Sequence, residues 1–388
     1  MKITQIFKGF FESEKTGGLI LLACTLISLF IANSGSGEGY IHFWHSYLDL
    51  SFASISLNYS IEHWVNDGLM TIFFLLVGLE IERELYKGEL ADIRNAVLPI
   101  AAALGGMAVP ALIHFAFNAG TASQSGFGIP MATDIAFTLG MLSLAGNRVP
   151  FSLKIFVTAL AIIDDLGAIL VIALFYSAGI GWGYLLSSLG IFALLMVLNK
   201  RGVKNLVFYT LPGIIMWYCM LKSGVHATIT GVLLAIAIPF SRDDRTNPSY
   251  LLQHALHKPV AFIILPIFAL ANTGILLQSG WIRELGNSNS LGIMLGLVAG
   301  KPIGILLFCW LVIRFQWAKL PMLVTWRHLM GAGILAGIGF TMSIFISNLA
   351  FTDPGRVQYS KIAVLIASLC ATILGLMVLF TLKPGKKE

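Results

Sequence analysis

The stretch AIIDDLGAIL, residues 161–170, places two adjacent carboxylates in the middle of a long apolar run. Uncharged, mostly hydrophobic residues flank Asp164 and Asp165 on both sides. A run of about 20 such residues is long enough to cross the hydrocarbon core of a bilayer as a helix. Ionisable side chains are rare inside such helices, because charge is costly there, and they usually mark a functional site. The pair therefore predicts a membrane protein whose function depends on two buried acids.

The composition agrees with a chain that is embedded in a membrane from end to end. Of its 388 residues, 57% are hydrophobic and only 11% are charged, whereas soluble domains carry about 25% charged residues. No polar stretch is long enough for a separate soluble domain, so residues 1–388 are expected to form one all-α membrane domain of about twelve transmembrane helices. The predicted helices cover residues 13–32, 61–86, 96–117, 123–144, 151–176, 182–199, 205–220, 224–240, 249–272, 291–312, 328–351 and 358–382.

The positive charges give the predicted helices an orientation. If the N-terminus is cytoplasmic, most of the 25 Lys and Arg residues fall at cytoplasmic helix ends and loops. The exceptions are Lys301, inside a predicted helix, and Lys222, Arg283, Arg356 and Lys361 on the outer side. This bias follows the positive-inside rule and predicts that both termini are cytoplasmic. It also accounts for the net charge of +6 without a nucleic-acid partner.

Four ionisable residues lie near the middle of predicted helices: Asp134, Asp164, Asp165 and Lys301. Consecutive helical positions point about 100° apart, so one acid of the pair can face a water-filled cavity while the other faces a neighbouring helix. Two adjacent carboxylates are expected to bind and release protons as a coupled unit. Carboxylate oxygens also suit hard cations such as sodium. The alternative is a structural cluster in which Lys301 neutralises one acid and ties helices together.

Two predicted helices carry residues that interrupt a helix. Pro130 lies within residues 123–144, and Gly337 and Gly339 lie within residues 328–351. Proline removes a backbone donor and glycine weakens a helix, so both spans are expected to be broken near the membrane midplane. For the glycines, close helix packing is the alternative.

The two predicted breaks occupy corresponding places in the chain. Each broken helix is the middle one of three, in predicted helices three to five and ten to twelve. Because three is an odd number, the two sets run in opposite directions, which is typical of inverted repeats in transporters. Asp134 is then placed to neutralise helix N-termini and Lys301 helix C-termini. Thr133 offers a hydroxyl oxygen beside Asp134.

The first outer loop predicts a small β-hairpin within residues 46–59. Apolar residues alternate in LDLSFASISLNY, residues 48–59, with a change of phase at Ala53–Ser54. Alternation with period two is typical of a strand, and the phase change marks the turn. The alternative is an irregular polar loop.

Six stretches of the chain resemble the NhaA-type sodium/proton antiporters of bacteria, and the resemblance covers essentially the whole chain. The stretches are FFLLVGLEIERELYKG (73–88), ATDIAF (132–137), ALAIIDDLGAI (159–169), LKSGVHAT (221–228), GKPIGI (300–305) and GIGFTMSIFI (337–346). The resemblance implies a twelve-helix bundle with inverted three-helix repeats and two crossed, broken helices. It also implies that the hairpin is a dimerisation element.

The resemblance assigns roles to the intramembrane residues. Asp165 is expected to be the main ligand of a sodium or lithium ion. Asp164 is expected to be the second carboxylate, which pairs with Lys301 when the cation is absent. Thr133 and Asp134 match the family's positions in the broken fourth helix.

The resemblance also points to residues that respond to pH. Glu80, Arg83 and Glu84 match the family's pH-response region at the cytoplasmic side. His254 and His257 lie at the inner end of the ninth predicted helix, where Gln253 replaces an acid of the best-known members. This departure bears on the expected pH profile.

His226, in LKSGVHAT, is a further candidate pH switch, because a histidine changes charge near neutral pH. The alternative is a histidine that is only locally hydrogen-bonded.

The expected function is sodium or lithium export in exchange for protons at the paired aspartates. The exchange is expected to be electrogenic and pH-regulated, in a homodimer in the bacterial inner membrane, without a cofactor or enzymatic activity. The alternative is a proton-coupled transporter of another small solute.

Two other classes fit less well. An intramembrane aspartyl protease with Asp134 and Asp165 as its dyad would leave Asp164 and Lys301 without a role. A channel is expected to show a filter ring, which the sequence lacks.

Overall fold

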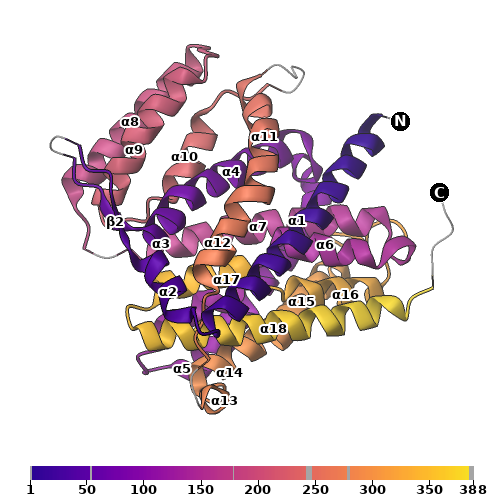
Figure 1. Ribbon diagram of the computed structural model, residues 1–388. Helices are drawn as coiled ribbons and strands as arrows, with labels where there is room; N and C mark the ends of the chain where they lie inside the picture. Colours follow the sequence, from indigo (N-terminus) through magenta and orange to yellow (C-terminus); the bar gives the residue numbers. More distant parts are fainter. Residues whose placement is uncertain (1, 53–54, 178, 242–246, 278–279, 384–388) are drawn as a thin grey trace. The chain divides into compact units, whose positions relative to one another are not determined.

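The computed structural model describes residues 2–52, 55–177, 179–241, 247–277 and 280–383, with side chains from residue 16 onward. The described chain is mostly helical (Figure 1). Its helices are α1 (Lys2–Ala32), α2 (Gly37–His45), α3 (Ile61–His63), η1 (Trp64–Leu69), α4 (Met70–Lys87), η2 (Glu89–Ala91), α5 (Ile93–Asn118), η3 (Gln124–Met131), α6 (Ile135–Leu144), η4 (Gly146–Arg148), α7 (Phe151–Phe175), α8 (Trp182–Lys200), α9 (Val207–Lys222), α10 (Ile229–Ala237), α11 (Pro248–Pro259), η5 (Val260–Ile264), α12 (Leu265–Asn272), α13 (Trp281–Glu284), α14 (Ser288–Leu295), η6 (Gly296–Gly300), α15 (Lys301–Arg314), α16 (Trp326–Ala336), α17 (Phe340–Ala350) and α18 (Pro354–Phe380).

Each of the twelve predicted ranges contains a helix or a bent pair of helices. Among the described residues, seven helices are long and apolar enough to cross a membrane, or ten if each bent pair counts as one span. The eighth prediction was too long, because α10 has only nine residues and is too short to cross a hydrocarbon core of about 30 Å. The helix α9, with 16 residues, is also shorter than a usual span.

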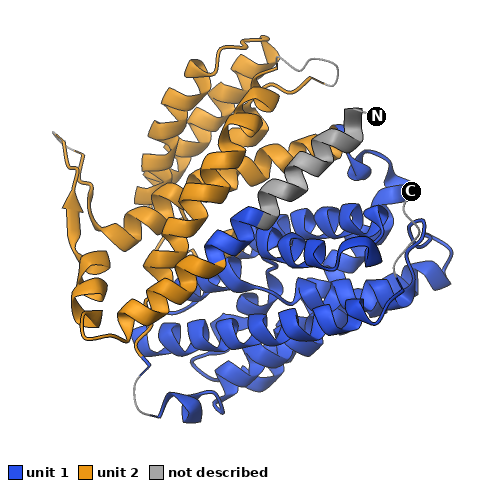
Figure 2. Cartoon of the chain, turned by 45° about the vertical axis from the view of Figure 1, so that its right-hand side comes forward, with its two compact units in different colours: residues 1–21, 87–171, 277–388 blue, residues 22–86, 172–276 orange. Residues whose placement is uncertain are grey.

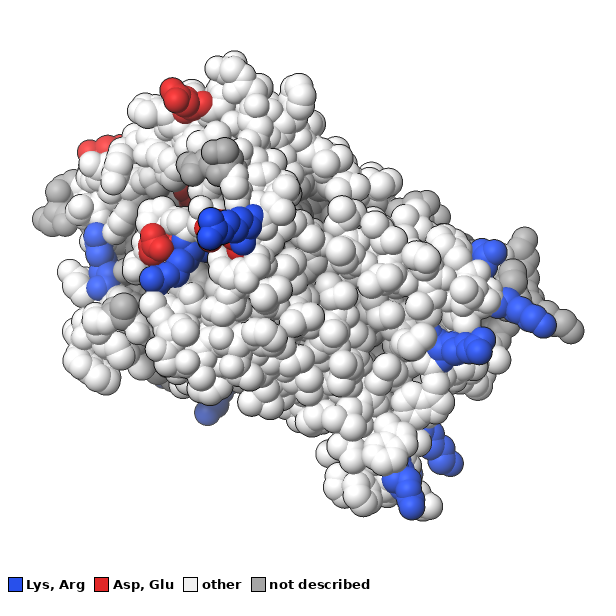
Figure 3. Space-filling view, turned by 90° about the horizontal axis from the view of Figure 1, so that it is seen from below, with Lys and Arg blue, Asp and Glu red and all other residues white. Residues whose placement is uncertain are grey.

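The surface carries its charges unevenly. On the face shown in Figure 3, the Lys, Arg, Asp and Glu side chains in view lie toward the edges, and a broad uncharged surface fills the part between them. Many large apolar side chains of the helices are exposed. An uncharged, apolar surface is what a helix presents to lipid.

Contacts divide the chain into two compact units, coloured in Figure 2. Unit 1 comprises residues 1–21, 87–171 and 277–388, and unit 2 comprises residues 22–86 and 172–276. Both units are discontinuous in the sequence. Unit 1 contains both of the predicted three-helix repeats, apart from the last five residues of the fifth predicted helix.

The predicted inversion of these repeats is visible in the contacts of the helices that open them. α5 packs against the continuous helix formed by α14, η6 and α15. A Cβ atom on Gly105 would lie 2.2 Å from the carbonyl oxygen of Gly304, and one on Gly292 would lie 2.9 Å from the Asn118 amide. Since the earlier residue of α5 meets the later residue of its partner, the two helices are antiparallel.

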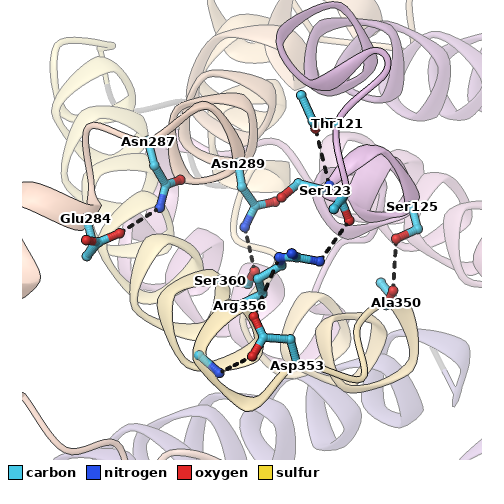
Figure 4. A network of polar contacts seen from close by, with 12 residues as sticks. Thr121, Ser123, Ser125, Glu284, Asn287, Asn289, Ala350, Asp353, Arg356 and Ser360 are labelled. Carbon is cyan, nitrogen blue, oxygen red and sulfur yellow. Dashed lines mark hydrogen bonds and ion pairs between the residues drawn. The ribbon is translucent and has the colours of Figure 1, made fainter.

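Two open pockets of unit 1 agree with this inversion. The starts of α5 and α7 and the loop after α15 line a pocket of about 680 Å³. The starts of α14 and α18 and the loop before η3 line a polar pocket of about 290 Å³, where Asn289 donates to Ser360 and Arg356 donates to the Ala122 carbonyl (Figure 4). The first and third helices of one repeat therefore begin at one pocket, and those of the other repeat begin at the other pocket.

The predicted hairpin is confirmed in unit 2. Strands β1 (Tyr47–Asp49) and β2 (Asn58–Ser60) pair in antiparallel fashion, with Leu48 opposite Tyr59. Backbone bonds continue toward the turn, where Phe52 and Ile55 exchange both hydrogen bonds. The turn residues themselves, where the sequence changes phase, lie outside the described residues. Tyr47 and Phe52 are 75% and 78% exposed, so the hairpin carries apolar surface.

The rest of unit 2 is a helical bundle in which α8, α9 and α10 pack together. Glycine allows α10 to approach the second predicted span closely. A Cβ atom on Gly231 would lie 2.3 Å from the Thr71 carbonyl oxygen, and one on Gly78 would lie 2.6 Å from the Ala235 side chain.

Candidate functional site

Both predicted helix breaks are confirmed, and both lie in unit 1. η3 and α6 are bent by 41° at a break over Ala132–Asp134, and α16 and α17 are bent by 44° at a break over Gly337–Gly339. Ala132 and Asp134 have extended backbone. The glycine at 337 is needed for close approach, because a Cβ atom there would lie 2.3 Å from the Leu297 carbonyl oxygen.

The two breaks contact each other. The backbone N–H of Asp134 donates to the carbonyl of Ile338 at 2.7 Å. η3 packs against α17, and α6 packs against α16. The first half of each broken helix therefore contacts the second half of the other. Backbone groups released by the breaks are buried in protein, which is the condition for non-helical backbone at membrane depth.

Asp134 lies at two helix N-termini. Its Oδ1 accepts a hydrogen bond from the Phe137 N–H at 2.9 Å, in the first turn of α6. Its Oδ2 accepts from the N–H and the hydroxyl of Thr341, at 3.1 and 2.5 Å, in the first turn of α17. One carboxylate thus meets the positive ends of two helices. These contacts agree with the predicted place of Asp134 at helix N-termini.

The side chain of Lys301 reaches the C-terminus of another helix, η3. Lys301 begins α15, directly after the π-helical turn η6. The ammonium donates to the carbonyl of Met131, the last residue of η3, and lies 2.8 Å from Oδ2 of Asp164. Both side chains of the ion pair are fully buried. The approach of α5 and α15 places Lys301 beside Gly106 of α5.

Asp164 has a second partner besides Lys301. The Thr133 hydroxyl lies 2.7 Å from Asp164 Oδ2 and 3.0 Å from the carbonyl of Ala336, the last residue of α16. Oδ1 of Asp164 has no hydrogen-bond partner within the described part of the chain. A buried acceptor of this kind has the capacity to bind a proton or a cation.

Asp165 occupies the next position of α7 and is also fully buried. Because consecutive helical positions diverge by about 100°, its side chain leaves α7 in a different direction from that of Asp164. Its charge nevertheless acts on Lys301. Three buried carboxylates and one ammonium therefore share this part of unit 1, and uptake of a proton or a cation would reduce the excess negative charge.

The contacts of this site include residues that the sequence did not single out. Thr341 supplies two hydrogen bonds to the Asp134 carboxylate, and Met131 supplies a carbonyl to Lys301. The Ser343 hydroxyl donates to the carbonyl of Ile129 at 2.7 Å and joins α17 to η3. The sequence signal that could have identified them is the pair of hydroxyl residues, Thr341 and Ser343, just after Gly339.

The predicted pH-response residues form a separate cluster in unit 2. Nη2 of Arg83 lies 3.1 Å from Oε1 of Glu84. Gln253 is hydrogen-bonded to the buried carboxyl group of Glu80. His257 is near enough to Arg83 for their charges to interact. The structure thus brings together residues of α4 and α11 that are far apart in the sequence.

The other histidines of interest take different places. His254 is exposed and stacks on Tyr250 of its own helix. His226 lies in the turn before α10, where Nε2 is 3.0 Å from the Tyr176 carbonyl oxygen. This contact agrees with a locally hydrogen-bonded histidine. His226 also lies near enough to Asp67 for the two groups to interact electrostatically.

Comparisons with known proteins agree with this architecture. The family model described as Na+/H+ antiporter 1 matches residues 8–379. A protein of Dechloromonas aromatica named Na(+)/H(+) antiporter NhaA is 58% identical over 380 residues, which are 97% of this chain and 96% of that protein. One of the same name from Cytophaga hutchinsonii is 57% identical over 377 residues, covering 97% and 95% of the two chains. One from Escherichia coli is 47% identical over 374 residues, covering 94% and 95%. The chain therefore belongs to the Na+/H+ antiporter 1 family and is a multi-pass bacterial membrane protein.

Proposed function

We propose that this chain exports sodium, and also lithium, from the cytoplasm in exchange for protons. Members of its family are transporters rather than enzymes. The observation that carries the proposal is the buried ion pair of Lys301 and Asp164 next to a second buried acid, Asp165. The pair lies where two broken helices of inverted repeats meet, which is where ion sites of such transporters are found.

The exchange rests on competition for the two carboxylates. In the arrangement described, Lys301 and Thr133 satisfy one oxygen of Asp164. A sodium ion that binds Asp164 and Asp165 replaces the ammonium as the counter-charge, since hard cations prefer oxygen ligands. Protons that return to the carboxylates release the ion. Protons and sodium therefore cannot occupy the site together.

Thr133 and Asp134, the two other predicted ligands of the cation, have different contacts and so different proposed roles. The hydroxyl oxygen of Thr133 lies beside Asp164 and is offered as a third ligand. Both oxygens of Asp134 accept hydrogen bonds from helix N-termini. Asp134 therefore acts on the cation chiefly through its charge and by holding the two breaks together.

Two carboxylates favour more than one proton per cation, so that each cycle moves net charge. A charge that crosses a potential of 100 mV carries about 2.3 kcal/mol, which helps to drive sodium outward. The uneven distribution of Lys and Arg along the sequence favours cytoplasmic termini, and the proposed location is the inner membrane.

Regulation and assembly complete the proposal. The cluster of Glu80, Arg83, Glu84 and His257 adjusts the activity to pH, with Gln253 in contact with Glu80. The exposed apolar hairpin is proposed to join two copies into a homodimer.

The test is proton release from everted membrane vesicles of cells that lack other sodium antiporters. Respiration acidifies the vesicle lumen, and a pH-sensitive dye then follows proton efflux after addition of sodium, lithium or potassium. We expect efflux with sodium and lithium, and none in Asp164→Asn or Asp165→Asn. The control Asp353→Asn removes an exposed carboxylate of unit 1 and should keep full activity. No response to any of these cations would favour a proton-coupled transporter of another solute.

A further inference from the structure

The larger pocket of unit 1 is not used by the proposed exchange reaction. It has a volume of about 680 Å³ and lies at the starts of α5 and α7, beside the loop that follows α15. The charge distribution assigns this end of the helices to the cytoplasm. Arg94, Lys319, Glu89 and Asn95 contribute its polar lining.

The pocket is bordered by a loop with unusual backbone. Gln316 and Leu323 both have a φ angle of +62°, a left-handed conformation that is rare for residues other than glycine and especially for large ones. The Ser152 hydroxyl, at the start of α7, donates to the carbonyl of Met322 at 2.5 Å and fastens the loop. Backbone in such conformations persists where the surrounding structure holds it, often at ligand sites.

The same loop exposes large apolar side chains. Trp317, Met322 and Leu323 are 68%, 77% and 64% exposed, and Trp317 and Met322 also line the pocket. Tryptophan together with aliphatic side chains is typical of the interface between lipid headgroups and acyl chains. The exposed cations Arg94 and Lys319 lie beside these apolar groups.

We propose that this pocket binds one anionic phospholipid of the cytoplasmic leaflet, with a hydroxylated headgroup of the phosphatidylglycerol type. The phosphate charge pairs with Arg94 and Lys319, as in other basic pockets between transmembrane helices. The headgroup hydroxyls donate to Glu89 and to the Asn95 side chain, and this accounts for a carboxylate in the lining. The acyl chains lie against Trp317 and Met322.

The test uses the full-length protein in detergent, titrated separately with phosphatidylglycerol and phosphatidylcholine. Native mass spectrometry counts the bound lipids, and thermal denaturation gives the shift in Tm. We expect tighter binding of phosphatidylglycerol and a higher Tm with it. Arg94→Gln/Lys319→Gln should weaken binding of phosphatidylglycerol about tenfold or more, since each cation near an anionic headgroup contributes about 1 kcal/mol. Binding of phosphatidylcholine should not change.

Two control variants distinguish a specific pocket from general surface charge. Arg94→Lys/Lys319→Arg keeps both charges and should keep the preference. Lys200→Gln/Lys383→Gln removes two exposed cations outside the pocket and should also keep it. Lys319→Gln alone, in an exposed loop, should lose part of the affinity for phosphatidylglycerol. This single variant keeps the test decisive if Arg94→Gln/Lys319→Gln fails to fold.

Three outcomes would overturn the proposal. The native protein could bind both lipids equally, or Arg94→Gln/Lys319→Gln could bind phosphatidylglycerol as tightly as the native protein does. Soluble glycerol phosphate could also raise Tm as much as the lipid at equal concentration, which would assign the pocket to a free phosphate ester. The test does not require transport activity, so its result is independent of the proposed exchange reaction.

Discussion

Lys301 Nζ lies 2.8 Å from Oδ2 of Asp164, and both side chains are fully buried. A buried ion pair is strongly asymmetric in its energetics, because each charge is tolerated only while the other is present. The ion pair is therefore stable while both charges are present, and a proton or cation that binds Asp164 takes away the partner of Lys301. This is the property that an exchange site requires.

Removal of the ammonium should destabilise the protein. We expect Lys301→Ala to lower the free energy of unfolding by about 3–5 kcal/mol, because Asp164 then keeps an unpaired buried charge. The loss should be larger at high pH than at low pH, since protonation of the acid removes the unpaired charge. Thermal denaturation in detergent at several pH values measures the effect.

A double variant provides the control for Lys301. Asp164→Asn combined with Lys301→Ala removes both charges and should recover most of the lost stability at high pH. Equal melting of Lys301→Ala and the native protein at every pH would show that the ion pair has no stabilising role.

Thr341 should be essential for holding the two breaks together. Its hydroxyl donates to Asp134 at 2.5 Å, and Thr341→Val removes this hydrogen bond with little change of shape. Loss of a hydrogen bond to a charged group costs about 1.5–3 kcal/mol. We expect a lower Tm and slower sodium-dependent proton release, whereas Thr341→Ser keeps the hydroxyl and should remain close to the native protein. If the valine and serine variants behave alike, the hydroxyl is not the operative group.

Close packing of α5 and α15 should tolerate no added methyl group. A Cβ atom on Gly304 would lie 2.0 Å from the Gly105 carbonyl oxygen, so Gly304→Ala must push the two helices apart. We expect a loss of about 1–3 kcal/mol and impaired transport, because Lys301 lies on the same helix. Gly190→Ala is the matched control in an exposed helix, where nothing lies within 4 Å of the added atom. Thermal denaturation of both variants tests this, and equal stability would refute the packing argument.

The hairpin should govern the oligomeric state. Replacement of residues 47–60 by a short glycine–serine linker removes the exposed apolar side chains of Tyr47 and Phe52. We expect a shift from dimer to monomer, measured by size exclusion with light scattering in detergent. Phe315→Ser/Met322→Ser removes exposed apolar side chains elsewhere and should leave the dimer intact. A dimer that survives loss of the hairpin would exclude this element as the contact.

Several features of the fold follow from the sequence alone, for physical reasons that act locally. A run of apolar residues must become a helix in lipid, because its backbone groups have no other hydrogen-bond partners there. Pro130, Gly337 and Gly339 weaken a helix wherever they stand, and both breaks lie at or next to them. Acids in the middle of such helices are costly enough to mark the site by their position.

The pairing of these groups could not be read from the sequence. Asp164 and Asp165 are adjacent and chemically identical, and only the orientation of α7 toward α15 makes Asp164 the partner of Lys301. Asp134 gains its partner Thr341 from a segment about two hundred residues away. Such contacts depend on how helices cross, and small residues such as Gly105 and Gly304 set that crossing through shape rather than through any pattern along the chain.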